Sequence, residues 1–250
     1  MSQPTIEELL EAGVHFGHLS SRWNPKMKQY IFTTRNSVHV INLEKTLEQL
    51  QKALDYARGI AARGGTILFV GTKRQAKEEV KKAAAACGMP YVTIRWLGGT
   101  FTNYKTIQKT IRKLERLARL KESGELAQKY IKKERLLMER EIEKLEKLFE
   151  GIKTMKKLPE AIFVVDVGHD RIAVKEAHTT GIKVIGLVDT NSSLAMVDYP
   201  IPSNDDAIKA IALMAKLVSE AIVDGKNHPA VAPALAGAPI IEEKQDESKN

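Results

Sequence analysis

Residues 95–111 read RWLGGTFTNYKTIQKTI and mark the point where the pattern of the chain changes. The apolar run before them ends at Ile94, and residues 105–150 contain no proline and one glycine, Gly124. Apolar residues then recur in steps of four, three, four and three at Met138, Ile142, Leu145, Phe149 and Ile152. Such a/d spacing is typical of the narrow seam of a coiled coil. We therefore predict that residues 105–157 form an antiparallel helical hairpin that bends near the glycine.

The excess positive charge of the chain lies entirely within this stretch. Between residues 105 and 157 there are 17 Lys and Arg against 9 Glu, a net charge of +8. The whole chain has 39 basic and 31 acidic residues, so the rest of the chain holds 22 of each. Mixed signs can simply solvate a pair of long helices. The concentration of the surplus favours a projecting basic arm that contacts a polyanion.

Length and composition indicate a globular protein with an acidic partner. A chain of 250 residues with 43% hydrophobic residues can hold one sizeable core and an excursion from it. Its net charge of +8 favours nucleic acid over a membrane surface as the partner. No apolar run approaches the ~18 residues of a membrane span, and the amino terminus lacks a secretory pattern. The single Cys87 excludes an internal disulfide, so the sequence predicts a cytoplasmic protein.

Three continuous apolar runs predict the central sheet. They are Thr66–Val70, Ala161–Val165 and Val184–Val188, and each is followed by a polar turn. Strands this apolar have no wet face, so they suit a parallel sheet covered by helices on both sides. Tyr91–Ile94 adds a further strand. The predicted fold class is α/β: a doubly wound, mainly parallel, Rossmann- or flavodoxin-like sheet, with the protruding helical hairpin inserted between Tyr91–Ile94 and Ala161–Val165.

Shorter elements are predicted around this sheet from apolar spacing and turn residues. In chain order they are a helix at 5–12, strands at Tyr30–Thr33 and Val38–Ile41, a helix from Leu43 to Gly64-Gly65, and a last helix at about 205–224. The predicted domains are a globular α/β domain (residues 1–104 and 158–225), the basic coiled-coil hairpin (105–157) and a flexible acidic tail (226–250).

The carboxyl ends of the predicted strands suggest an enzyme as an alternative, because ligands bind there in such folds. Gly71-Thr72-Lys73-Arg74 could hold a phosphate, but it lacks the spacing of a nucleotide-binding loop. A hard cation could be held by three aspartates and a histidine: Asp166, Asp170, Asp189 and His169. The alternative is that these residues are helix caps and turn residues, which are needed at strand ends in any case. No Ser or Cys lies in a nucleophile elbow. The sequence therefore predicts no catalytic residue, no metal site and no cofactor.

The amino-terminal loop combines cations with aromatic residues. Between Arg22 and Asn42 there is no acidic residue, and Trp23, Tyr30 and Phe32 are interleaved with the cations Arg22, Lys26, Lys28 and Arg35. Cations for phosphates beside rings that can stack on bases are the mixture expected of an RNA-binding surface. The alternative for the three rings is that they anchor an irregular loop on the core.

Several long strings of the sequence are specific enough to compare with known families. They are GVHFGHLSSRWNPKMKQYIFTTRNSVHVINLEKT (13–46), VGTKRQA (70–76), CGMPYVTIRWLGGTFTNYKTI (87–107), GIKTMKKLPEAIFVVD (151–166) and IPSNDDAIKAI (201–211). Together they closely resemble the family of bacterial small-subunit ribosomal protein two, over about residues 6–225. The resemblance implies a doubly wound α/β domain with a protruding helical hairpin, a place on the small ribosomal subunit and binding to ribosomal RNA. It also implies help in recruiting ribosomal protein one, and no catalytic activity.

One loop departs from the pattern of that family. After Val188-Asp189-Thr190-Asn191 the family usually carries a Cys-Asp-Pro-Asp type of loop, whereas this chain has Ser192-Ser193-Leu194-Ala195-Met196. Contacts that depend on those acidic residues are therefore not carried over to this chain.

The cations of three regions are predicted to contact RNA phosphates, which fix position without reading bases, and Trp23 is predicted to bind RNA beside them. The predicted residues are Arg22, Trp23, Lys26, Lys28 and Arg35 in the amino-terminal loop, Lys73, Arg74 and Arg95 near the sheet edge, and Lys105, Lys109, Arg112, Lys113, Lys153, Lys156 and Lys157 at the base of the hairpin. The last seven, here called the collar, are expected to be one end of a continuous basic surface. The predicted partners are small-subunit ribosomal RNA and neighbouring ribosomal proteins, including protein one, with no membrane and no small-molecule substrate. The alternatives are an enzyme and a membrane-surface protein.

Overall fold

The computed structural model describes residues 4–126 and 130–229. In chain order its helices are α1 (Ile6–Glu11), α2 (Leu43–Ala62), α3 (Lys77–Cys87), α4 (Tyr104–Glu122), α6 (Lys132–Phe149), α7 (Arg171–Thr179) and α8 (Ile208–Asn227). Its strands are β1 (Phe16–Leu19), β2 (Ile31–Arg35), β3 (Val38–Ile41), β4 (Ile67–Val70), β5 (Tyr91–Val92), β6 (Ala161–Val164), β7 (Lys183–Val188) and β8 (Tyr199–Pro202). Two short 3-10 helices, Ser20–Arg22 and Pro25–Tyr30, lie between β1 and β2.

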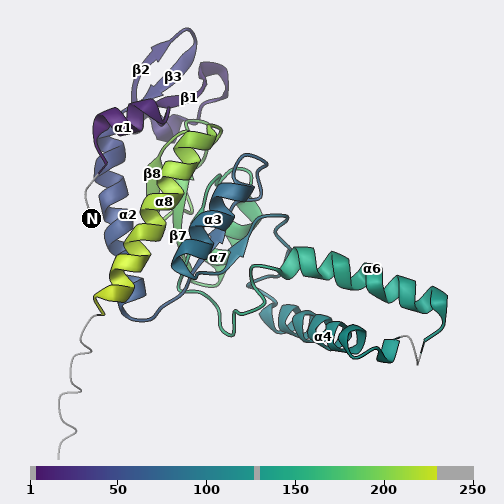
Figure 1. Ribbon diagram of the computed structural model, residues 1–250. Coiled ribbons are helices and arrows are strands. Elements are labelled where there is room, and N and C mark those ends of the chain that lie inside the picture. Colours follow the sequence, from purple (N-terminus) through teal and green to yellow (C-terminus); the bar gives the residue numbers. More distant parts are fainter. Residues whose placement is uncertain (1–3, 127–129, 230–250) are drawn as a thin grey trace, which may run out of the picture.

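Five strands form a parallel sheet in the order β5-β4-β6-β7-β8 (Figure 1). The predicted parallel α/β sheet is thereby confirmed. Every residue of β4 and β6 is buried, as expected for strands covered on both faces. The sequence does not predict β8, because Pro200 and Pro202 lack the N–H group that a ladder uses. Both prolines are tolerated because β8 lies at an edge of the sheet.

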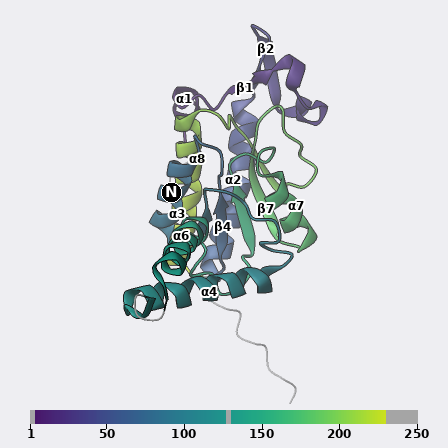
Figure 2. The same cartoon turned by 90° about the vertical axis from the view of Figure 1, so that its right-hand side faces the viewer.

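Alternate strand residues point to opposite faces of the sheet and build two apolar layers. Ile67, Phe69 and Phe163 pack in the layer made with α2, α3 and α8. Leu68 and Val164 pack in the layer made with α7 and the segment that leads into α4. Figure 2 shows α3 and α8 on one side of the sheet and α7 on the other. Helices thus cover both faces, in agreement with the predicted doubly wound arrangement.

Between β5 and β6 the chain runs away from the sheet through α4 and returns through α6, and the two helices lie side by side (Figure 1). Their facing sides bury an apolar set: Ile107, Ile111, Leu114, Leu117, Ile142 and Phe149. Lys113 of α4 also pairs with Glu141 of α6 at 2.5 Å. Gly124, near the expected bend, has a φ of +75°, and residues 127–129 lie outside the described part of the chain.

The amino-terminal segment forms a second, antiparallel sheet in the order β1-β3-β2, called the small sheet below. The sequence predicts β2 and β3 but not β1, because Gly17 and His18 interrupt the alternation of apolar residues there. The strand forms because Phe16 and Leu19 pair with β3. The predicted strand at Tyr30–Thr33 is shifted toward the carboxyl terminus, since Tyr30 ends a 3-10 helix.

Two predicted limits are wrong. The strand at Tyr91–Ile94 ends at Val92, and Ile94 is exposed. The last helix continues to Asn227, so the tail cannot begin at residue 226. Residues 230–250, where most of the acidic tail is predicted, lie outside the described residues. Within the described ranges no helix has both the length and the apolar composition that crossing a membrane requires.

Candidate functional site

The basic residues of the amino-terminal segment lie on the outside of the small sheet and its 3-10 helices. All four are exposed: Arg22, Lys26, Lys28 and Arg35. None of them forms an ion pair with another described residue. Their charges are therefore not neutralised within the described part of the chain.

The aromatic residues of this segment divide into two groups. Tyr30 is buried, and the half-buried Trp23 ring lies 5.3 Å from the His39 ring. Tyr30 packs in the core, as the packing interpretation expects, whereas the Trp23 ring packs on His39 within the segment itself. Phe32 differs, because 72% of its surface is exposed on β2. The packing interpretation is therefore wrong for Phe32.

A second basic surface lies where α4 begins and the chain returns after α6. The Tyr104 hydroxyl donates to the Met155 carbonyl at 2.7 Å, and Gln108 Nε2 donates to the Lys156 carbonyl at 3.1 Å. These bonds fix the first turns of α4 against the segment after α6. All seven collar residues are exposed: Lys105, Lys109, Arg112, Lys113, Lys153, Lys156 and Lys157. Only Lys113 among them pairs with a described carboxylate, that of Glu141.

The two basic surfaces lie at opposite ends of the strands of the parallel sheet. The small sheet is attached beyond the carboxyl ends of the strands, where His18 N donates to Thr190 Oγ1 at 2.8 Å. Lys156 and Lys157 instead share a surface hollow with Pro90, which directly precedes β5. In Figure 2 the labels β2 and α4 accordingly stand at opposite ends of the molecule. The geometry thus gives two basic surfaces where the sequence suggests one continuous surface.

The three cations predicted near the sheet edge have different surroundings. Arg74 and Arg95 are exposed and form no ion pair with a described residue. Lys73 has only 15% of its side chain exposed, and its Nζ lies 3.0 Å from Asp166, 2.8 Å from Asp205 and 2.7 Å from Asp206. The prediction that Lys73 contacts RNA phosphate is corrected, because three carboxylates already share its ammonium group.

Lys73 belongs to an acidic cluster at the carboxyl ends of β6, β7 and β8. Burial lowers the pKa of Lys73, but its hydrogen bonds to Asp205 and Asp206 raise the pKa by more than burial lowers it. The net shift is upward. Burial raises the pKa of Asp205 to about 7, and the nearby carboxylates of Asp166 and Asp189 add to this effect. One ammonium group therefore does not balance the carboxylates around it.

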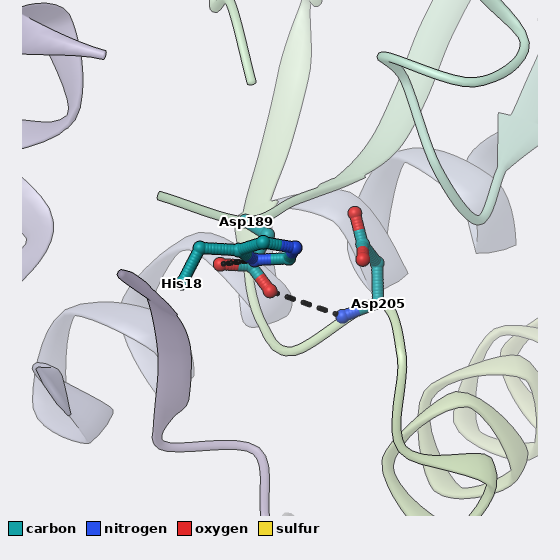
Figure 3. Close-up of side chains that lie close together, drawn as sticks. All are labelled: His18, Asp189 and Asp205. Carbon is teal, nitrogen blue, oxygen red and sulfur yellow. Dashed lines mark hydrogen bonds and ion pairs between the residues drawn. The ribbon is translucent and has the colours of Figure 1, made fainter. Parts of the chain in front are cut away.

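His18 of β1 reaches into the same cluster (Figure 3). Its Nδ1 lies 3.0 Å from Asp189 Oδ1, and its Nε2 lies 3.3 Å from Asp206 Oδ2. The short contact with Asp189 is the main reason why the pKa of His18 is raised. Asp189 is in turn held between Thr190, whose N–H it accepts at 2.5 Å, and Asp205, whose N–H it accepts at 3.4 Å. The cluster therefore joins the small sheet to the loops after β7 and β8.

Two of the residues considered for a hard cation from the sequence, Asp166 and Asp170, have structural roles. Asp170 accepts the Thr72 N–H at 3.1 Å and the Thr72 hydroxyl at 2.7 Å. Asp166 accepts the His169 N–H at 2.8 Å and forms the bond to Lys73. The turn interpretation therefore holds for Asp166, whereas Asp170 links two strand ends and makes no capping bond to α7.

The loop after β4 lacks the features of a phosphate cradle. The Thr72 N–H is occupied by Asp170, so it is not available to a ligand. A Cβ atom added to Gly71 would lie 2.6 Å from Val80 Cγ2, so this glycine serves the close packing of α3. The helix itself begins only at Lys77. These contacts weaken the enzyme alternative at this loop.

Glu176 of α7 is a structural anchor that sequence reasoning missed. Its buried carboxylate accepts the N–H groups of Gly99 at 2.7 Å and Phe101 at 2.9 Å, and two longer bonds from Trp96 Nε1 and Thr102 N. These donors all lie in the segment that leads into α4. A carboxylate on a helix surface resembles an ordinary solvated charge in the sequence, so no local pattern could reveal this role.

The contacts of His18 with Asp189 and Asp205 are also invisible in the sequence, because 171 residues separate His18 from Asp189. Only the attachment of β1 to the carboxyl edge of the sheet brings them together.

Residues 9–225 match the family model described as Ribosomal protein S2. The match covers the parallel sheet, the small sheet, α4 and α6, and therefore both basic surfaces and the acidic cluster.

Proposed function

Because this chain belongs to the ribosomal protein S2 family, we propose that it binds ribosomal RNA as a structural component of the bacterial small ribosomal subunit. The family is one of structural ribosomal proteins and not of enzymes. A component of the bacterial ribosome works in the cytoplasm, which is where we place this chain.

The observation that carries the proposal is the set of exposed cations without carboxylate partners on two surfaces. On the small sheet they are Arg22, Lys26, Lys28 and Arg35, and on the collar they are Lys105, Lys109, Arg112, Lys153, Lys156 and Lys157. Uncompensated cations gain most from phosphates, because binding releases the counterions condensed on RNA. Two surfaces at opposite ends of the strands of one sheet suit a protein that holds separate RNA segments at a set spacing.

In this proposal α4 and α6 act as a coiled-coil arm. The collar carries RNA contacts at its base, and the apolar seam between the helices keeps the arm straight. Exposed Leu136 and Leu137 lie on the outer side of α6, away from the seam. Arg74 and Arg95 extend the RNA contact along the carboxyl edge of the sheet.

Rebinding to small subunits stripped of this protein tests the RNA proposal. Labelled full-length chain is sedimented with the stripped subunits over a series of salt concentrations. We expect binding that weakens steeply with salt, with a slope of log affinity against log salt of about −0.7 to −0.9 for each phosphate contact. Sedimentation free of the subunits at every salt concentration contradicts the proposal.

We further propose that the chain supports the docking of protein one, which family membership suggests. Stripped subunits are incubated with protein one with and without the rebound chain. Capture of protein one only after rebinding is the expected result. Equal capture in both samples would remove this part of the proposal and leave RNA binding untouched.

A nucleotide or membrane ligand would give a different result in a simpler assay. A nucleotide bound at a hundredfold excess over its dissociation constant stabilises a protein by about 2.7 kcal/mol. We expect no thermal shift with a nucleotide panel and magnesium, because Thr72 and Lys73 are already occupied by aspartates. We also expect no binding to anionic vesicles at physiological salt.

A further inference from the structure

Three potential metal ligands meet at the carboxyl edge of the sheet. His18 comes from β1, Asp189 follows β7 and Asp205 follows β8 (Figure 3). One ligand atom from each residue lies within 4.8 Å of the other two. Figure 3 shows the His18 ring beside the Asp189 carboxylate, with the Asp205 side chain facing the ring from another segment. Three separate segments of the chain thus point donor atoms at one small space.

Two potential metal-ligating atoms in this space have no hydrogen-bond partner among the described residues. They are His18 Nδ1 and Asp205 Oδ2, and both atoms are buried. The His18 atom is close to Asp189, at 3.0 Å, but its geometry is not that of a hydrogen bond. Asp205 has no exposed surface, and its other oxygen is held by Lys73. Since buried polar atoms are almost always paired, Asp205 Oδ2, which no described group contacts by a hydrogen bond or ion pair, indicates a missing partner.

The charges around the site favour a positively charged partner. Four carboxylates surround the site: Asp166, Asp189, Asp205 and Asp206. Lys73 supplies one positive charge, which leaves a deficit even when His18 is protonated. Burial of like charges without full compensation is costly, and a divalent cation would relieve it. Lys73 can keep all three of its carboxylate contacts, because Asp205 would offer its unpaired Oδ2.

We propose that His18, Asp189 and Asp205 bind a zinc ion that fastens the small sheet to the parallel sheet. Imidazole nitrogen is a typical zinc ligand, and carboxylate oxygens complete zinc sites at ~2.0–2.2 Å. Magnesium and calcium prefer oxygen ligands alone, so the histidine disfavours them. Asp206, half-exposed and 3.3 Å from His18 Nε2, lies where it can orient the ring in the manner of a carboxylate beside a zinc-bound histidine.

The position of the site gives the ion a structural task. The small sheet and its 3-10 helices carry four exposed cations, Arg22, Lys26, Lys28 and Arg35. His18 lies in β1, so an ion bound to His18 would hold the small sheet in place. Apart from this site, β1 is tied to the loop after β7 by the bond from His18 N to Thr190 Oγ1. A zinc ion would cross-link residues 18, 189 and 205, so its binding energy would add to the stability of the folded chain.

Metal titration of the full-length chain tests the proposal. The chain is treated with a chelator, transferred to metal-free buffer and titrated with Zn²⁺ against a chromophoric zinc indicator. We expect about one equivalent to bind, and at a hundredfold excess over the dissociation constant we expect the Tm to rise by roughly 5–10 °C. Zinc K-edge absorption should then report nitrogen and oxygen ligands without sulfur.

Matched variants locate the ion. His18→Gln should lower zinc affinity by at least about a hundredfold. Asp205→Asn keeps the shape of the side chain and should likewise abolish the zinc-dependent rise in Tm. His178→Gln, which changes an exposed histidine of α7, should bind zinc like the original chain. Circular dichroism of each metal-free variant establishes that it is folded, and Asp205→Asn decides the matter if His18→Gln does not fold.

Three outcomes overturn the proposal. One is zinc binding by the original chain no stronger than by His18→Gln or Asp205→Asn. Another is a sulfur ligand in the absorption spectrum, which would place zinc on Cys87. The third is a larger rise in Tm with Mg²⁺ or Ca²⁺ than with Zn²⁺.

Discussion

Two basic elements are attached to the same sheet by buried carboxylates, and the two attachments are built differently. Glu176 holds the segment leading into α4 with one carboxylate that accepts four N–H groups. The acidic cluster holds the small sheet with four carboxylates and one ammonium group, and two of its buried atoms, His18 Nδ1 and Asp205 Oδ2, form no hydrogen bond with a described residue. A carboxylate saturated by donors fixes a backbone conformation. A cluster with surplus charge keeps capacity for a ligand.

The largest expected effect comes from breaking the saturated attachment. Glu176→Ala leaves buried N–H groups of Gly99 and Phe101 without acceptors and opens a cavity beside Trp96. We expect a loss of about 4 kcal/mol in the free energy of unfolding. The loss of hydrogen bonds to a charged group and the burial of unsatisfied N–H donors both contribute to it. Urea denaturation followed by circular dichroism measures this loss.

The control for this variant is Glu220→Ala, which removes an exposed carboxylate of α8 that forms only a 3.7 Å pair with Lys216. Its effect should stay within about 0.5 kcal/mol. Similar losses in the two variants would show that Glu176 is no special anchor.

A somewhat smaller loss is expected from the unbalanced attachment. Lys73→Met keeps the apolar stem but leaves Asp166, Asp205 and Asp206 without their shared cation. We expect a loss of about 3 kcal/mol in metal-free buffer, because removing one partner of a buried ion pair leaves uncompensated charge. If the cluster accepts a divalent cation, zinc should recover part of this loss.

The same denaturation series with Lys175→Met, an exposed lysine of α7, provides the control. Zinc should stabilise Glu176→Ala and the original chain by the same amount, because both keep His18, Asp189 and Asp205. The loss that Glu176→Ala shows relative to the original chain should therefore stay the same with zinc. If zinc reduced the loss of both variants relative to the original chain to the same extent, the distinction between the two attachments would be contradicted.

Close packing at the base of the arm should contribute less than either charged site. A Cβ atom added to Gly151 would overlap the carbonyl oxygen of Tyr91 in β5. We expect Gly151→Ala to cost about 2 kcal/mol, because backbone must move to admit the methyl group. Thermal denaturation would detect this as a lower Tm, whereas Gly98→Ala, which meets no atom within 4 Å, should change the Tm little.

The smallest effect on stability, with a clear effect on RNA binding, is expected at the collar. Lys105→Gln, Lys109→Gln and Lys156→Gln together remove three exposed cations that have no described carboxylate partner. Lys113 is left in place because Glu141 already neutralises it. The slope of log affinity against log salt for stripped small subunits should become shallower by about 2 to 3 in total. The Tm should stay unchanged.

The matched control replaces Lys52, Lys209 and Lys216 of α2 and α8 with Gln, which removes the same charge from the body of the protein. An equal change in slope for both triple variants would mean that only net charge matters. An unchanged slope for the collar variant would mean that the collar merely solvates the arm.

The sequence alone determined the elements whose signal is local. Runs such as Ile67–Val70 are apolar throughout, which fits a strand buried on both faces, and the structure has a parallel strand there. Charge counting located the basic surplus of residues 105–157, because charge does not depend on folding. The long strings that resemble ribosomal protein two identified the family that the match over residues 9–225 shows.

Elements that depend on a distant partner could not be predicted. β1 and β8 contain glycine or proline and become strands only through pairing with β3 and β7. Lys73 looked like a free cation because its three aspartate partners lie 93 or more residues away. Glu176 and the pair His18 and Asp189 likewise acquire their roles from contacts across the fold. The electrostatic free energy of a side chain depends on burial and on neighbours in space, and only the tertiary structure sets both.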